Sequence, residues 1–166
     1  MSFVDAIKSG FRNYVTFKGR ASRSEFWWWT LFAVIVQSVT SVLDETINSI
    51  ASLALLLPGL AVNVRRLHDT NRRGTWLIWP LVTLVVGIVS FILFAVSASL
   101  DFEKASEWDL ENAVQGGPVA FIIVGSVALL ATLVLGILNL SFTLMKSDPE
   151  MNRFGPPPPP KSLPTN

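Results

Sequence analysis

One short segment, RRLHDTNRR at positions 65–73, holds the residues best suited to chemistry. His68 followed by Asp69 could form a general base with its orienting carboxylate. Adjacent residues on a helix point about 100° apart, however, and the sequence offers no second histidine and no cysteine to complete a relay or a metal site around His68. We therefore expect these two residues to form a structural turn, and we predict no catalytic residue, no metal and no cofactor.

The four arginines of the same segment suggest phosphate binding instead: Arg65, Arg66, Arg72 and Arg73. A guanidinium group stays charged at any accessible pH and can hold two phosphate oxygens at once, so anionic lipid headgroups are the expected ligands. The alternative is that these arginines only anchor helix ends on the cytoplasmic side of a membrane. The sequence leaves both interpretations open.

A second polar segment, KGRASRSEFWWW at positions 18–29, precedes the first apolar run. Gly19 permits a sharp turn, and Ser22 with Glu25 predicts a capping box that starts a helix. The three tryptophans that follow are expected at the membrane interface, where amphipathic rings are favoured. We predict that Glu25 pairs with an arginine of the segment 65–73.

Both segments would then form one polar layer at a single membrane surface. The candidate residues share charge or hydrogen-bonding capacity and a predicted place in this layer: Arg20, Arg23, Glu25, Arg65, Arg66, His68, Asp69, Arg72, Arg73 and Arg153.

The elements that must position these residues are apolar and long. The 166-residue chain is 51% hydrophobic and only 15% charged, which is too apolar for a soluble domain of this size. Each apolar run approaches the roughly 20 residues that a helix needs to cross a bilayer. We predict an all-α polytopic membrane bundle over residues 1–155 with a proline-rich cytoplasmic tail at 156–166, and spans at about 26–43, 46–64, 74–100 and 117–145.

The first residues predict an additional amphipathic helix that lies in the plane of the headgroups. Its apolar residues recur at helical spacing: Phe3, Ile7, Phe11 and Tyr14. Ser2 and Asp5 are placed to cap its start.

Charge predicts the orientation. With four spans, every lysine and arginine except Lys104 falls on one side, which should be the cytoplasm, so both termini should be cytoplasmic. The acidic stretch at 101–111 would face the opposite side.

The interiors of the predicted spans contain no ionisable residue, which argues against a proton-coupled transporter. Small and polar residues do form stripes on the third and fourth spans, and we expect them to pack helices together rather than to line a pore. They are Thr83, Gly87 and Ser90 on the third span, and Gly125, Ala128, Thr132, Gly136, Asn139 and Thr143 on the fourth.

The ordered combination of YVTFKGRASRSEFWWW, RRLHDTNRRGTW and NRFGPPP resembles the bacterial inner-membrane proteins of domain-of-unknown-function family 805 (DUF805). The resemblance implies a multi-pass protein of the bacterial cytoplasmic membrane, and it implies no activity. The stretch at 101–111 departs from the family's compact pattern, so no role for it is implied. The resemblance would make these the signature positions: Gly19, Arg20, Arg23, Glu25, Arg65, Arg66, Leu67, His68, Asp69, Asn152, Arg153, Phe154 and Gly155.

The function predicted from these observations is non-enzymatic. A basic cytoplasmic face would bind anionic membrane lipid or a partner protein, the chain could form a homo-oligomer, and no nucleic acid is expected. Two alternatives stay open: a small oligomeric channel or transporter, and a membrane enzyme that acts on phosphorylated lipid.

Overall fold

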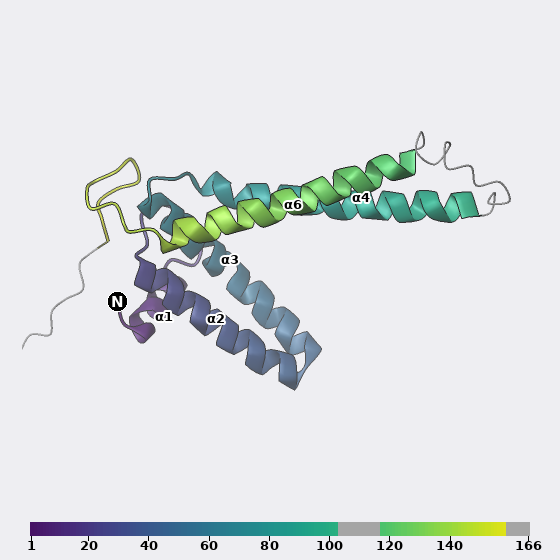
Figure 1. Cartoon of the computed structure of the whole chain (residues 1–166). Coiled ribbons are helices and arrows are strands. Elements are labelled where there is room, and N and C mark those ends of the chain that lie inside the picture. Colours follow the sequence, from purple (N-terminus) through teal and green to yellow (C-terminus); the bar gives the residue numbers. More distant parts are fainter. Residues whose placement is uncertain (103–116, 159–166) are drawn as a thin grey trace, which may run out of the picture. The chain divides into compact units, whose positions relative to one another are not determined.

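The computed structural model describes residues 1–102 and 117–158, and its regular elements in those ranges are helices (Figure 1). This confirms the predicted all-α class. Lys104 and most of the acidic stretch at 101–111 lie outside the described residues, as does the end of the proline-rich tail. In chain order the elements are α1 (Phe3–Arg12), α2 (Arg23–Leu43), α3 (Glu45–Asp69), the 3-10 turn η1 (Gly74–Leu77), α4 (Ile78–Phe102) and α6 (Gly117–Leu144).

Within the described ranges, four helices are long and apolar enough to cross a membrane, as predicted. Their apolar stretches are Arg23–Leu43, Glu45–Asp69, Gly74–Ser97 and Val119–Leu144. Helix α3, which contains the second predicted span, continues past the predicted end of that span at residue 64 and ends at Asp69. The prediction that His68 and Asp69 form a turn is therefore wrong, because both lie in the last turn of α3 and the chain leaves the helix only at Thr70.

The structure divides into two compact units, one of Met1–Leu77 with Leu140–Asn166 and one of Ile78–Asn139. In the first unit α2 and α3 form a helical hairpin (Figure 1). Asp44 makes the tight connection, because its carboxylate accepts hydrogen bonds from the backbone N–H groups of Thr46 at 2.8 Å and Ile47 at 3.1 Å. These hydrogen bonds, with that from Ile47 contributing most and that from Thr46 next, hold the pKa of Asp44 below its ordinary value. This cap starts α3 directly where α2 ends.

Helix α1 packs against α2 through its small residues. The predicted cap is present, since Ser2 and Asp5 bond reciprocally at its start. Ala6 and Gly10 are buried. A Cβ at Gly10 would lie only 2.1 Å from Cε3 of Trp29, so the absence of a side chain there allows the two helices to approach.

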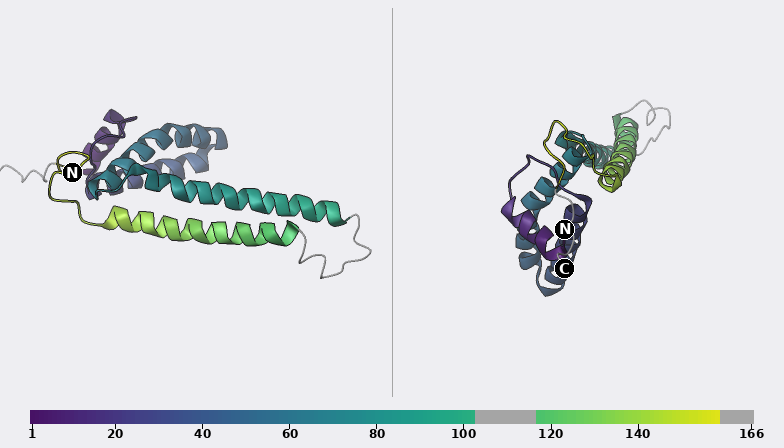
Figure 2. Two further views of the ribbon diagram at one scale, coloured as in Figure 1. Left: turned by 90° about the horizontal axis from the view of Figure 1, so that it is seen from above. Right: turned by 90° about the vertical axis from the view of Figure 1, so that its left-hand side faces the viewer.

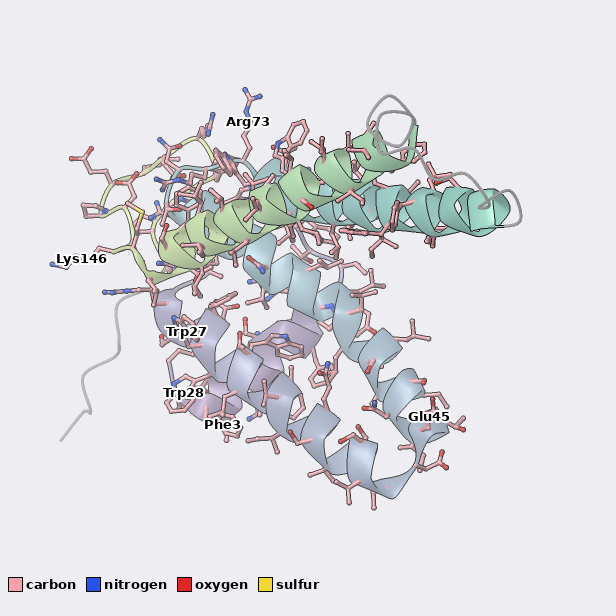
Figure 3. The ribbon with its side chains drawn as sticks, turned by 45° about the vertical axis from the view of Figure 1, so that its right-hand side comes forward. Phe3, Trp27, Trp28, Glu45, Arg73 and Lys146 are labelled. Carbon is pink, nitrogen blue, oxygen red and sulfur yellow. The ribbon has the colours of Figure 1, made fainter. Side chains whose placement is uncertain are left out.

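The three tryptophans of α2 do not share one environment. Trp27 and Trp28 are exposed, as expected for interfacial rings, and Phe3 meets Trp28 edge-on with ring centroids 5.7 Å apart (Figure 3). Trp29 is only 2% exposed and packs in a core cluster with Leu55 and Val62 of α3. The prediction of an interfacial position is thus wrong for Trp29, because helical periodicity turns it toward α1 and α3.

The second unit contains α4 and α6 up to Asn139, lying side by side (Figure 2). Thr132 donates a hydrogen bond across the pair to Thr83 at 2.8 Å between the hydroxyl oxygens. A Cβ at Gly87 or Gly125 would approach side chains of the other helix to 3.1 and 3.0 Å. These contacts confirm that much of the stripe packs helices, whereas a Cβ at Gly136 would meet no atom within 4 Å.

Candidate functional site

The polar layer lies in the first unit, where the start of α2 and the end of α3 meet the segment 145–155. Backbone hydrogen bonds join the parts. The Ala21 N–H donates to the Arg65 carbonyl at 3.0 Å, and the Asp148 N–H donates to the Asp69 carbonyl at 3.1 Å. The segment before α2 and the segment after α6 are therefore both attached to the end of α3.

Asp69 is the centre of this layer. Its side chain is fully buried, and its Oδ1 pairs with Nη2 of Arg20 at 2.9 Å. Its second oxygen, Oδ2, pairs with Nη1 of Arg66, one helical turn away. One buried carboxylate thus serves two buried guanidinium groups.

The remaining donors of these two arginines bind backbone carbonyls in the last turn of α6 and in the segment that follows it. Arg20 donates from Nη1 to the carbonyl of Glu150 at 2.7 Å and from Nη2 to that of Asp148. Arg66 donates from Nε to the carbonyl of Thr143 at 3.1 Å and from Nη2 to that of Met145. Both arginines therefore hold the chain end of α6 onto the end of α3, and neither presents its guanidinium to a lipid.

The expected pair between Glu25 and an arginine of the segment 65–73 is present. Arg65 Nη1 lies 2.9 Å from Glu25 Oε1, and both side chains are only 6% exposed. The hydroxyl of Ser9 in α1 donates to the same oxygen at 2.8 Å. Because the carboxylate points to these partners, only half of the predicted capping box forms, with Ser22 Oγ accepting from the Glu25 N–H at 3.2 Å.

His68 supports the segment after α6. Its ring stacks on Phe154 with centroids 3.8 Å apart and planes 4° apart. Its Nδ1 donates to the carbonyl of Gly19 at 3.2 Å, which requires the tautomer with hydrogen on Nδ1. Asn152 Nδ2 donates to the backbone carbonyl of His68 at 3.0 Å. This packing gives His68 a structural position rather than that of a base facing a substrate, and Gly19 supplies the sharp turn with φ of +88°.

The other predicted site residues are more exposed and keep most of their donors available. Arg23, Arg73 and Arg153 are exposed, while Arg72 is half-buried with its guanidinium 3.8 Å from the ring centre of Phe142. Two of these arginines are hydrogen-bonded to the layer: Arg23 donates to the Leu144 carbonyl at 3.4 Å, and Arg153 donates to the Asn71 carbonyl at 2.7 Å. Lys146, also exposed, joins them, and Figure 3 shows Arg73 and Lys146 extending away from the ribbon.

The structure thus separates the predicted site into an interior and an exterior group. The residues whose charges are buried are Arg20, Glu25, Arg65, Arg66 and Asp69. Ser9 and the carbonyls at 143–150 were not predicted, because a hydroxyl on an amphipathic helix and a backbone oxygen carry no distinctive sequence signal. No three or more His, Asp and Glu side chains within residues 1–102 and 117–158 are grouped so that they could hold a metal ion.

Comparison with known proteins gives the same picture of a membrane protein. The profile of the family described as "Protein of unknown function (DUF805)" matches residues 14–156. The chain is similar to Inner membrane protein YhaI of Escherichia coli (strain K12), with 35% identity over 95 residues, which cover 53% of this chain and 80% of that protein. It is also similar to Inner membrane protein YhaH of the same strain, with 34% identity over 104 residues, 56% of this chain and 85% of that protein. No solved structure matches the chain.

Proposed function

Because the chain belongs to the DUF805 family and is an integral membrane protein, we propose that its exposed basic end binds anionic lipid headgroups at the cytoplasmic surface without catalysing a reaction. We call the exposed cations at this end the basic surface: Arg23, Arg73, Lys146 and Arg153.

One observation carries the proposal: the arginines of the layer are divided between interior and exterior. Arg20 and Arg66 are bound by Asp69 and by carbonyls, so they are committed to the fold. Within residues 1–102 and 117–158 no cation of the basic surface forms an ion pair, and Arg23 and Arg153 donate to neutral carbonyls. Uncompensated cations beside a bilayer attract phosphate, with about 1 kcal/mol for each lysine or arginine near an anionic leaflet.

Charge distribution also supports the proposed orientation. Within residues 1–102 and 117–158, every lysine and arginine lies at or before the start of α2, between Arg65 and Arg73, or after Leu144, whereas Asp44 and Glu45 lie where α2 ends and α3 begins. Short basic segments beside spans are retained in the cytoplasm. The basic surface would then face the leaflet that carries the anionic headgroups.

The proposal is tested by the lipid that remains with the purified protein. In one variant, glutamine replaces all four residues of the basic surface; in a matched variant, lysine replaces Arg23, Arg73 and Arg153. Mass spectrometry would measure the enrichment of phosphatidylglycerol over phosphatidylethanolamine. The glutamine variant should lose the enrichment, with up to about 4 kcal/mol removed for four cations, and the lysine variant should keep it because charge acts here without a fixed geometry.

Unchanged enrichment in the glutamine variant would overturn the lipid proposal. If that variant instead lost a co-purifying protein, the basic surface would be assigned to a protein partner. High salt should reduce the parent's enrichment, since charges exposed to water are screened.

The orientation has its own test, which uses the absence of native cysteine. Cysteines would be introduced singly at Lys8, Glu45 and Met151, which are all exposed. In intact cells an impermeant thiol reagent should label only the cysteine at position 45, at the start of α3. Labelling at 151 but not at 8 would mean an odd number of spans and would contradict the topology.

A further inference from the structure

Arg65 is the one arginine of the interior group whose donors are not all used by the described residues. Its Nη1 binds Glu25, but its Nε and Nη2 are buried and have no hydrogen-bond partner among residues 1–102 and 117–158. These two N–H groups lie on the same edge of the guanidinium and point in parallel. They form the fork that fits two oxygens of a carboxylate or a phosphate.

The charges of the interior group do not balance. Three arginines, Arg20, Arg65 and Arg66, are buried with two carboxylates, Glu25 and Asp69, which leaves a net charge of +1. A buried charge without a counter-charge is strongly unfavourable. The other two arginines have their donors taken by Asp69 and by carbonyls, so Arg65 is where donors remain to bind an anion.

The position of the fork identifies the kind of anion. Glu25 lies in the first turn of α2, next to the exposed rings of Trp27 and Trp28, which marks the depth of the lipid headgroups. The abundant oxyanion at that depth is the phosphodiester of a phospholipid. It carries a single negative charge and two free oxygens, which match the charge of +1 and the two unpaired donors.

We infer that the Nε and Nη2 groups of Arg65 bind the phosphodiester of one membrane phospholipid. This deepens the proposed function, but it rests on other residues and on another chemistry. The basic surface selects net negative charge, whereas the fork recognises the phosphodiester that zwitterionic and anionic phospholipids share. Both donor atoms are covered by the protein's own atoms, so a bound phosphodiester would take the place of that cover and would be shielded from salt.

Native mass spectrometry of the full chain after a high-salt wash tests this inference. The probes are phosphatidylethanolamine, phosphatidylglycerol and inorganic phosphate, each added to delipidated protein. The parent should retain one phospholipid of either kind. Arg65→Lys keeps the charge and the partner of Glu25 but removes the fork, and it should lower the retained fraction by about tenfold or more. Arg12→Lys, an exposed change of the same chemistry outside both binding surfaces, should have no effect.

Glu25→Gln makes the opposite prediction, compared in samples whose helical circular dichroism matches that of the parent. It breaks the 2.9 Å ion pair and raises the interior charge from +1 to +2, yet leaves the fork intact. Lipid retention should therefore stay equal or increase, whereas a purely structural role for the pair predicts a loss.

Results of three kinds would overturn the inference. The first is a parent that retains no phospholipid, so that only water serves the fork. The second is equal retention by Arg65→Lys, or a loss in Glu25→Gln. The third is binding of inorganic phosphate with no retained lipid, which would make the site one for a small free anion. The glutamine variant of the basic surface should keep this lipid while losing its anionic enrichment, so the two proposals can fail separately.

Discussion

Asp69→Asn should be among the most destabilising conservative changes in the protein. The carboxylate is fully buried and pairs with Arg20 at 2.9 Å and also with Arg66. Asparagine has nearly the same volume, so the change removes charge without creating a cavity. The net charge of the interior group would rise from +1 to +2.

The expected size follows from breaking a buried ion pair, which costs about 3–5 kcal/mol when one partner is left without its counter-charge. Two arginines depend on Asp69, so the upper part of that range applies. Carbonyl bonds at Glu150 and Thr143 remain and limit the loss. The free energy of unfolding can be measured by denaturant titration in detergent micelles.

Glu150→Gln is the matched control, because its side chain is exposed in the same segment and should change stability by less than about 0.5 kcal/mol. A double-mutant cycle with Arg66→Gln should give a coupling energy of at least about 1 kcal/mol. If Asp69→Asn cost less than about 1 kcal/mol, or if the coupling were near zero, the reasoning that Asp69 holds this layer together would be refuted.

Two further changes test the fold. Gly10→Ala should destabilise the protein by about 1–2 kcal/mol despite the better helix propensity of alanine, because its Cβ would lie within 2.2 Å of two ring carbons of Trp29. The control Gly136→Ala, whose Cβ would meet no atom within 4 Å, should be neutral or stabilising. Equal effects of the two changes on stability would contradict the packing of α1 against Trp29. Because the lowered pKa of Asp44 means that the folded state favours its charged form, the cap should stabilise α3 above the ordinary pKa of 3.8 and lose this contribution as pH falls through the lowered value. Unfolding curves of the parent and Asp44→Asn between about pH 5 and 2 should converge toward acid if this sign is right, and a constant difference would show it to be wrong.

The helices could be predicted from the sequence because their signals are local. Long uncharged runs predicted the four spans, and the stripes of small and polar residues predicted helix packing, which the contact of Thr132 with Thr83 bears out. The pairing of Glu25 with an arginine of the segment 65–73 also followed, since the opposite charges fall at helix ends on the same surface, and the structure identifies that arginine as Arg65.

The interior of the polar layer could not be predicted in the same way. The partners of Arg20 are far along the chain, at Asp69 and at the carbonyl of Glu150, and a carbonyl has no residue type. Residue type also does not distinguish arginines of the same segment by burial: Arg66 is fully buried, while Arg73 is exposed. The burial of Trp29 beside the exposed Trp28 could not be predicted either: periodicity shows that the two rings point in different directions, but not which direction meets α1 and α3.

Headgroup cross-linking tests the central claim, lipid binding by the basic surface, most directly. Phosphatidylglycerol and phosphatidylcholine with the same photoreactive group in the headgroup would be incorporated into bilayers that contain the protein, and the modified peptides identified by mass spectrometry. Phosphatidylglycerol should modify peptides that contain Arg23, Arg73 and Lys146 more strongly than phosphatidylcholine does, with no such preference around Glu45 at the opposite end of α3. Equal labelling by both lipids at the basic surface, or a preference for phosphatidylglycerol around Glu45, would contradict the account.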